Sequence, residues 1–129
     1  MQLLKPKLRE VKNRMYGYLN KTEFTKLVIN KRSAIVINNK SLKDLDEYLI
    51  NLKIYLDNSG VNTSIFNIPK VIKNKAKNTY TIFFIVRHSK DKECEREFKR
   101  ALQLVKNIEP NSTDLRSVCG INTRRDIYE

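Results

Sequence analysis

Residues 60–87 read GVNTSIFNIPKVIKNKAKNTYTIFFIVR and contain two strand-like segments joined by a lysine-rich loop. Residues 61–68 alternate as a strand does and end at Pro69, which cannot donate to a β ladder. Residues 79–87 carry the strongest strand signal, because residues 81–86 are all β-branched or aromatic. The charged residues of the loop are all basic: Lys70, Lys73, Lys75 and Lys77. The stretch therefore predicts an extended β-hairpin arm with a positive tip.

A strand and a helix are predicted on the N-terminal side of this arm. Residues 33–38 form a short apolar run with polar boundaries, which is typical of a strand. Leucines then recur at three- and four-residue steps, at Leu42, Leu45, Leu49, Leu52 and Leu56. This spacing predicts an amphipathic helix of about four turns. We expect Ser41 to cap its first turn and Gly60 to end it in the left-handed conformation.

Residues 92–108 have two interpretations. Their apolar side chains lie at helical spacing, but residues 98–108 also suit a strand that tertiary contacts would impose. A short helix over residues 114–118 and a last strand over residues 120–128 complete the chain. The order strand, helix, strand, strand, helix, strand predicts an α+β fold of the ferredoxin-like split βαβ type (βαββαβ). In such a plait both helices cover one face of an antiparallel sheet.

Basic charge is clustered along the chain, which has 129 residues, a net charge of +12 and a pI of about 9.8. Residues 1–40 carry ten basic and two acidic side chains, and residues 67–92 carry seven and one. Residues 41–66 have two basic and four acidic side chains, and residues 93–129 have seven of each. A monomer that meets only metabolites rarely carries such self-repulsion, so a polyanion is the expected partner.

Several other classes of protein are not expected from this composition. No apolar stretch reaches the ~18 residues of a transmembrane helix, so no membrane partner is predicted. Cys94 and Cys119 are interpreted as reduced thiols, and with His88 as the only histidine we expect no metal site. The three glycines form no phosphate-binding loop, so neither a cofactor nor a small-molecule substrate is predicted.

Residues 1–32 are interpreted as a basic N-terminal extension that precedes a domain over residues 33–129. Residues Val11, Met15, Tyr18 and Leu19 have helical spacing. A short helix and an arm that becomes ordered only on a partner are both open. An organellar transit peptide is a further alternative, although such peptides favour Arg and Ser over Lys and Asn.

Several short motifs resemble, in order, the small-subunit ribosomal protein S-ten family. Ser59-Gly60-Val61 is similar to the Thr-Gly-Ala turn of that family, Ile68-Pro69 to its Leu-Pro-Thr loop, and Tyr80-Thr81-Ile82 to its Tyr-Thr-Val. The segment RHSKDKEC at residues 87–94 resembles its Arg-Ser-Pro-His and Asp-Lys-x-Ser stretch. Phe98, the segment LVKNIEP at residues 104–110, and Thr113-Asp114-Leu115 follow in family order. The likeness covers about residues 33–128.

The resemblance implies a structural protein of the small-subunit head that binds ribosomal RNA and neighbouring ribosomal proteins. In that family the core is ferredoxin-like, a long hairpin reaches proteins and RNA, and the segment matching residues 98–108 is a strand. The motif spacing departs from that of bacterial members, and the region before residue 33 has no counterpart in them. These departures look more like a mitochondrial ribosomal protein; a cytoplasmic location is the alternative.

Cationic residues are the candidate RNA contacts, because lysine binds phosphate as a point charge and arginine also stacks on bases. The arm contributes Lys70, Lys73, Lys75 and Lys77, and the segment after it contributes Arg87, His88, Lys90 and Lys92. The C-terminus contributes Arg124 and Arg125, and the N-terminal extension contributes Lys5, Lys7, Arg9, Lys12 and Arg14. Each group has an alternative role as solvated surface charge. Tyr16 and Tyr18 either stack on bases or pack on the domain surface.

Catalysis is not predicted, and two alternative functions stay open. The first is a free-standing nucleic-acid-binding plait, such as a phage or plasmid regulator, which would fold alone and bind short duplexes. The second is a small nuclease in which Asp91 orients His88 as a general base. Glu93, Glu95 and Glu97 are expected to form a solvated acidic face or to contact a basic neighbouring protein.

Overall fold

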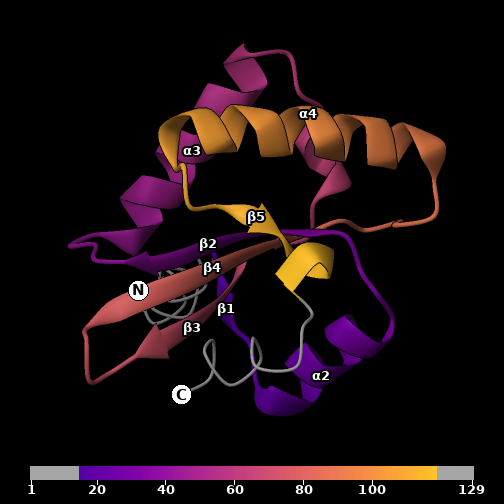
Figure 1. Ribbon diagram of the computed structural model, residues 1–129. Coiled ribbons are helices and arrows are strands. Elements are labelled where there is room, and N and C mark those ends of the chain that lie inside the picture. The colour runs from indigo at the N-terminus through magenta and orange to yellow at the C-terminus, as the bar shows by residue number, and fades with distance from the viewer. Residues whose placement is uncertain (1–14, 119–129) are drawn as a thin grey trace, which may run out of the picture.

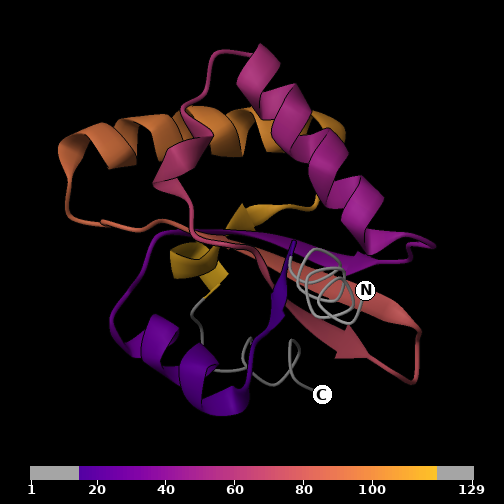
Figure 2. The ribbon, with the colours of Figure 1, turned by 180° about the vertical axis from the view of Figure 1, so that it is seen from behind.

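The computed structural model describes residues 15–118, which form a five-stranded mixed sheet with helices on both faces (Figure 1 and Figure 2). Its elements are β1 (Gly17–Tyr18), α2 (Lys21–Ile29), β2 (Ala34–Lys40), α3 (Leu45–Asn58), β3 (Lys70–Asn74), β4 (Thr79–Ile85), α4 (Lys92–Ile108) and β5 (Thr113–Asp114). The strand order is β1-β3-β4-β2-β5, with β1 parallel to β3 and every other neighbouring pair antiparallel. The chain is therefore of mixed α and β structure, as predicted.

The two faces of the sheet have separate cores, because β2 and β4 are buried on both sides. Helices α3 and α4 cover one face, and α2 covers the other (Figure 1). The core under α3 and α4 contains Ile35, Ile37, Ile82, Phe84 and Val86. The core under α2 contains Ala34, Val36, Phe83, Ile85 and Leu115. This double burial explains why the apolar run of β4 does not alternate with polar residues.

Helix α3 begins later than its sequence suggests. Asp44, not Ser41, is the N-cap, and its carboxylate accepts a hydrogen bond of 3.0 Å from the Glu47 N–H. A carboxylate at this position also complements the positive end of the helix. The predicted end is confirmed: Gly60 has a φ of +86°, and the Val61 N–H donates to the Leu56 carbonyl at 3.0 Å.

The segment over residues 61–68 does not form the predicted strand. It contains a 3-10 turn at Thr63–Ile65, because the Asn62 side chain accepts from the Ser64 N–H and caps the turn. Phe66 makes only an isolated bridge to Val86. The ladder begins after Pro69 rather than ending there, so the lysines that were assigned to a loop lie on β3 and in the turn that follows it.

The β3–β4 hairpin is shorter than the predicted extended arm. β2 pairs with β4 as far as Lys40 and Tyr80, so the sheet supports most of the hairpin. Only residues 74–79 continue past that pair. The physical reason is the apolar sequence of β4: its two faces are buried under the helices, so it lies inside the sheet with β2 and β3 paired to its two edges.

Residues 92–108 form one helix. The interpretation from helical spacing is therefore confirmed, and the strand implied by the family resemblance is wrong. Asp91 caps α4, and buried Cys94, Phe98, Ala101 and Val105 form its apolar face. The short helix predicted at residues 114–118 is instead β5 followed by a 3-10 turn at Leu115–Val118. The reason is that β5 pairs with the free edge of β2. The predicted last strand lies outside the described part of the chain.

Part of the predicted N-terminal extension packs on the sheet. An Asn20–Glu23 capping box starts α2, and Phe24 is buried against Phe83 with ring centroids 5.9 Å apart. Residues 17–18 pair with β3 as a parallel edge strand instead of continuing a helical repeat. The boundary at residue 33 stays a prediction, and residues 1–14 lie outside the described region.

Candidate nucleic-acid interface

The β3–β4 hairpin carries three exposed lysines that have no ion-pair partner within residues 15–118: Lys73, Lys75 and Lys77. The Lys73 ammonium lies 5.4 Å from the centroid of the Tyr80 ring, opposite it on β4. The turn between the strands is held by the Asn74 side chain, which accepts a 3.1 Å hydrogen bond from the Lys77 N–H. The hairpin therefore presents three free positive charges at its end.

Lys70 differs from the other lysines of the hairpin. Side chains alternate across a strand, so Lys70 lies beside Phe83 on the α2 face while Lys73 lies beside Tyr80 on the α3 face. The Lys70 ammonium is also 3.8 Å from the Glu23 carboxylate. Lys73 thus lies on the α3 face and Lys75 and Lys77 lie in the turn, whereas Lys70 is partly neutralised on the other face.

Tyr80 lies beside Lys73, and two further tyrosines lie on the opposite side of β3 from β4. β1 pairs with β3, which brings Tyr16 and Tyr18 to the outer edge of the hairpin. Their ring centroids are 5.7 Å apart in an edge-to-face arrangement, and Tyr18 is 60% exposed. Tyr16 also packs against the α3 core, as does Tyr80. We call these tyrosines together with Lys73, Lys75 and Lys77 the hairpin surface.

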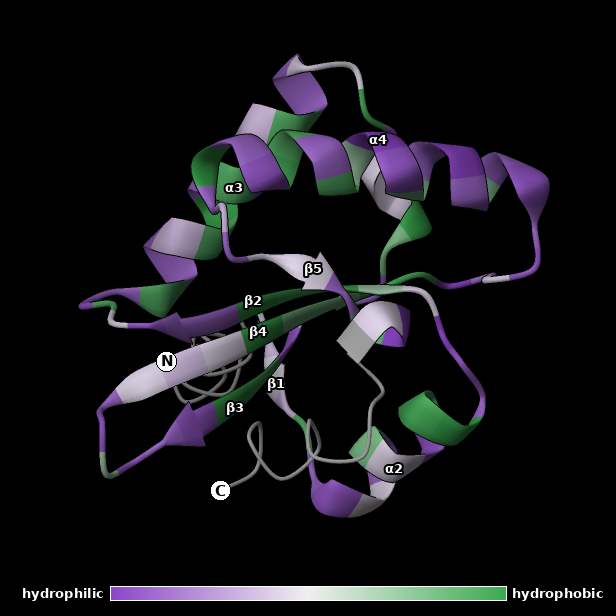
Figure 3. Cartoon of the chain, in the orientation of Figure 1, coloured by the Kyte–Doolittle hydropathy of each residue, from purple (hydrophilic) through white to green (hydrophobic). Residues whose placement is uncertain are grey.

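The phenol group of Tyr16 is held in its neutral form. Its pKa is raised to about 12 by burial, by a side-chain hydrogen bond with Tyr18, and by the negative charge of Tyr18, Tyr80 and Asp46. The hairpin surface therefore combines lysine charge with aromatic rings. Figure 3 shows that the ends of β2 and β3 near the hairpin turn are hydrophilic, in contrast to the apolar middle of the sheet. Charge with aromatic faces is the combination that binds single-stranded nucleic acid.

The second predicted basic group lies at the opposite end of the sheet, in the connection from β4 to α4 (Figure 1). Its exposed members are Arg87, His88, Lys90 and Lys92. The Arg87 Nε atom donates to the Phe66 carbonyl at 3.2 Å, and the Arg87 N–H donates to the Ile65 carbonyl at 2.7 Å. Arg87 thus holds the segment after α3 against β4, whatever else it contacts. The two basic groups do not form one continuous site.

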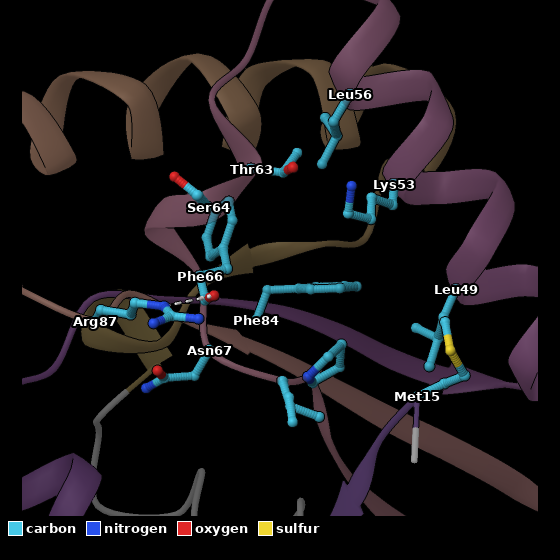
Figure 4. A pocket seen from close by; sticks show the side chains of 12 residues that line it. Met15, Leu49, Lys53, Leu56, Thr63, Ser64, Phe66, Asn67, Phe84 and Arg87 are labelled. Atoms are coloured by element: carbon cyan, nitrogen blue, oxygen red, sulfur yellow. Dashed lines mark hydrogen bonds between the residues drawn. The ribbon is translucent and has the colours of Figure 1, made fainter. Parts of the chain in front are cut away.

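A pocket of about 400 Å³ lies beside Arg87, between α3 and the sheet (Figure 4). Its apolar wall includes Phe66 and Phe84, whose ring centroids are 6.2 Å apart. Lys53 lies at its rim but pairs with Asp57 at 2.8 Å. The pocket offers an apolar surface with a few polar groups and no pair of acid and base side chains.

Within residues 15–118, no hydrogen bond joins the His88 ring to the carboxylate that the nuclease alternative requires. The Asp91 carboxylate accepts a 2.8 Å hydrogen bond from the Glu93 N–H as the cap of α4. Asp91 touches His88 only through its backbone N–H, which donates to the His88 carbonyl at 3.1 Å. Within residues 15–118 no group of three or more His, Cys, Asp or Glu side chains could hold a metal ion. In the same region no helix is long and apolar enough to cross a membrane.

The three alternating glutamates of α4 do not form the predicted acidic face. Glu93 pairs with Arg96, and Glu95 pairs with Arg116 at 3.2 Å. Glu97 is buried, with 7% of the residue exposed. The helix distributes the three side chains because successive residues turn by about 100°, so each meets a different neighbour.

The remaining candidates are divided between the core and the ends of the sequence outside the described region. Cys94 is a buried free thiol, and burial raises its pKa. Arg124, Arg125 and Cys119 lie outside the described region, as do the basic residues predicted at positions 5–14. Tyr80 was not predicted as a site residue. The available signal was its position in the hairpin, where it lies opposite a lysine.

Comparison with known proteins found no matching family model, curated protein or solved structure.

Proposed function

We propose that the protein is a structural RNA-binding protein that acts without catalysis, as an S-ten-like constituent of a small ribosomal subunit. The hairpin surface carries this proposal. Its three unpaired lysines suit phosphate groups, and the neighbouring ring of Tyr18 is exposed enough to stack on a base. Lys73 beside Tyr80 places a charge next to an aromatic face, so one strand of RNA can use both.

The arrangement from β2 to β5 supports a ferredoxin-like plait as the finer fold. Strand, helix, strand, strand, helix and strand follow one another, with the strand order β3-β4-β2-β5. Helices α3 and α4 cover one face, as a split βαβ plait requires. In this proposal β1 and α2 are additions that extend the edge and cover the opposite face.

The ribosomal setting is supported by the net charge of +12 and by the ordered motifs that resemble the S-ten family. Ribosomal RNA of the small-subunit head and neighbouring ribosomal proteins would be the partners, and the departures from bacterial spacing favour a mitochondrial ribosome. The lysine-rich turn would then reach into RNA, while the sheet and its helices hold the orientation of the protein.

A free-standing nucleic-acid-binding plait is the second candidate, and two observations favour it. Residues 98–108 lie within a helix, where the S-ten family has a strand. The hairpin is also short and sheet-supported rather than a long projecting arm. A protein of this shape can fold without a ribosome around it.

Two measurements on the full-length chain separate these candidates. The first is the binding of labelled single-stranded RNA, structured RNA and duplex DNA over a range of salt concentrations. The second is the sedimentation of a tagged chain in extracts of its own cells. RNA binding with sedimentation in the small subunit supports the ribosomal role. Binding to short duplexes without sedimentation supports the second candidate, and binding to no nucleic acid contradicts both. RNA cleavage by the purified chain that His88→Ala abolishes would instead support the nuclease.

A further inference from the structure

A second pocket, of about 220 Å³, lies where β2 ends and where the chain leaves α4. Its lining consists of Ile37, Asn38, Asn39, Lys40, Glu109, Pro110, Asn111 and Ser112. Lys40 pairs with Tyr80 across the sheet, so the pocket is at the same end of the molecule as the hairpin turn. RNA on the hairpin surface would reach the mouth of the pocket by crossing this end of the sheet from β3 towards β2.

The pocket is built by an irregularity in β2. The register between β2 and β4 shifts between Ile37 and Lys40, and Asn39 has a φ of +50°. Asparagine tolerates this left-handed conformation better than most residues, but the conformation still costs free energy. Bulges of this kind redirect side chains and occur often beside functional sites. Here the bulge brings two asparagine residues to the wall of the pocket.

Ser112 gives an independent sign that the pocket has an occupant. The residue is 5% exposed, and its hydroxyl has no hydrogen-bond partner within the described chain. A buried polar group without a partner is uncommon, because it loses its interactions with water and regains none. A polar group that enters the pocket would give this hydroxyl the hydrogen-bond partner that residues 15–118 do not supply.

The charged groups of the pocket neutralise each other. The Lys40 ammonium lies 3.0 Å from the Glu109 carboxylate, and the Tyr48 hydroxyl donates a hydrogen bond to the same carboxylate. A phosphate would be repelled by Glu109, and a metal cation would be repelled by Lys40. A neutral polar group suits this pocket better than either ion.

Three amide side chains indicate which kind of neutral polar group would bind in the pocket. Asn38, Asn39 and Asn111 line the pocket, and no hydrogen bond within residues 15–118 uses their side chains. Each carboxamide offers two donors and an acceptor, which is the pattern that pairs with the edge of a nucleobase. The volume is also below the ~300–1,000 Å³ of pockets for drug-sized ligands, so it suits one small flat group.

From these observations we propose that this pocket binds a single unpaired nucleobase of the RNA that lies on the hairpin surface. The identity of the natural ligand rests on the proposed RNA-binding function. The pocket itself is tested with mononucleotides, so that test does not require binding of an RNA polymer. The direct test is NMR titration of the ¹⁵N-labelled full-length chain with AMP, GMP, CMP and UMP, and with ribose 5-phosphate as the control. We expect signals of the pocket residues to shift with at least one nucleotide and not with ribose 5-phosphate. Shifts elsewhere only, or equal shifts with ribose 5-phosphate, would overturn the proposal.

A double variant, Asn111→Ala with Ser112→Ala, tests the residues that make the pocket. We expect its nucleotide affinity to fall about tenfold or more, which is the scale of one bidentate base contact. Asn107→Ala, an exposed asparagine on α4, is the matched control and should bind as the native chain does. Circular dichroism of each variant establishes that it is folded, and the single variant Asn111→Ala replaces the double variant if the latter unfolds.

The polymer experiment distinguishes failure of the pocket from failure of the proposed function. We expect the double variant to lose its preference among homopolymer RNAs while the salt dependence of binding stays native. If the preference among RNAs is unchanged, the proposal for the pocket is contradicted and the proposed RNA-binding function still holds. If the chain binds nucleotides but binds none of the RNAs, the proposed function is contradicted and the proposal for the pocket still holds.

Discussion

The backbone N–H of Asn62 donates a 2.7 Å hydrogen bond to the Oε1 atom of Glu97, which links the turn after α3 to the middle of α4. The other carboxylate oxygen of Glu97 accepts a 3.0 Å hydrogen bond from Arg100. Arg100 in turn donates to the carbonyl of Gly60 at 3.2 Å. A buried carboxylate thus ties together the two helices that cover one face of the sheet.

Stability should depend on pH through Glu97. The Asn62 hydrogen bond, followed by the contribution of Arg100, holds the pKa of this carboxyl below its ordinary value. A lowered folded-state pKa stabilises the fold above the unfolded pKa of about 4.3, and this contribution is lost as the pH falls through the folded value. We expect Glu97→Gln to lower the free energy of unfolding at neutral pH by about 1 kcal/mol and to flatten its decline in acid. Urea titrations over this pH range measure both effects. The exposed Glu93→Gln is the control, and an equal loss in it would contradict the assignment.

Leu49 should be essential for the core under α3. It is 3% exposed, and its neighbour Ile50 is 42% exposed on the outer side of the helix. We expect Leu49→Ala to lower the free energy of unfolding by about 2–5 kcal/mol, because the substitution leaves a cavity. Ile50→Ala should change it by less than about 0.5 kcal/mol. Equal effects in denaturant unfolding would mean that the buried face of α3 is assigned incorrectly.

Gly60 should resist substitution for a conformational reason. Its φ of +86° is left-handed, and an alanine there would strain the backbone by about 1–2 kcal/mol. Asn58 is the last residue of α3, where alanine is a good helix former, so Asn58→Ala is the matched control. Thermal unfolding should show a lower midpoint for Gly60→Ala alone. A native midpoint for that variant would show that the helix end adjusts without cost.

Charge on the hairpin should determine how RNA binding depends on salt. Replacing Lys73, Lys75 and Lys77 together by alanine removes the unpaired charges of the hairpin surface. For single-stranded RNA the slope of log K against log salt should decrease in magnitude by about 2. A control with the same loss of charge replaces exposed Lys26, Lys31 and Lys99, which lie on α2, after α2 and on α4. If both triple variants change the slope equally, the salt dependence of binding is determined by the net charge of the protein and not by the position of the lysines on the hairpin.

Tyr18 should contribute to RNA affinity by stacking. Because the residue is 60% exposed, Tyr18→Ala should leave stability nearly unchanged. It should weaken binding of single-stranded RNA by about 1–3 kcal/mol without altering the salt slope. Tyr18→Phe keeps the ring and should bind nearly as the native chain does. A loss in the phenylalanine variant as large as in the alanine variant would assign the effect to the hydroxyl and its contact with Tyr16.

Local signals in the sequence were sufficient for several elements. The leucine spacing predicted α3, glycine predicted its end, and the β-branched run predicted β4. For residues 92–108 the helical period indicated the correct element even where the family resemblance implied a strand. These signals are reliable because helical spacing, capping and strand propensity depend on residues that are close in sequence.

Other local signals were overridden by contacts that no short window contains. Residues 61–68 alternate as a strand does, yet Asn62 caps a 3-10 turn and donates its N–H to Glu97, 35 residues away. Residues 17–18 continue a helical spacing, yet they pair with β3. In both places a distant partner satisfies backbone groups that the local structure would otherwise satisfy.

The sequence alone determined that the protein is basic, that its positive charge is clustered, and that four lysines gather between Pro69 and Tyr80. Only the tertiary structure decided which of those residues lie together. It joined Tyr16 and Tyr18 to Lys73 and Tyr80 through the pairing of β1 with β3, and it placed Lys70 on the other face. Charge belongs to each residue by itself, whereas a surface depends on strand register and packing between segments that are far apart in the chain.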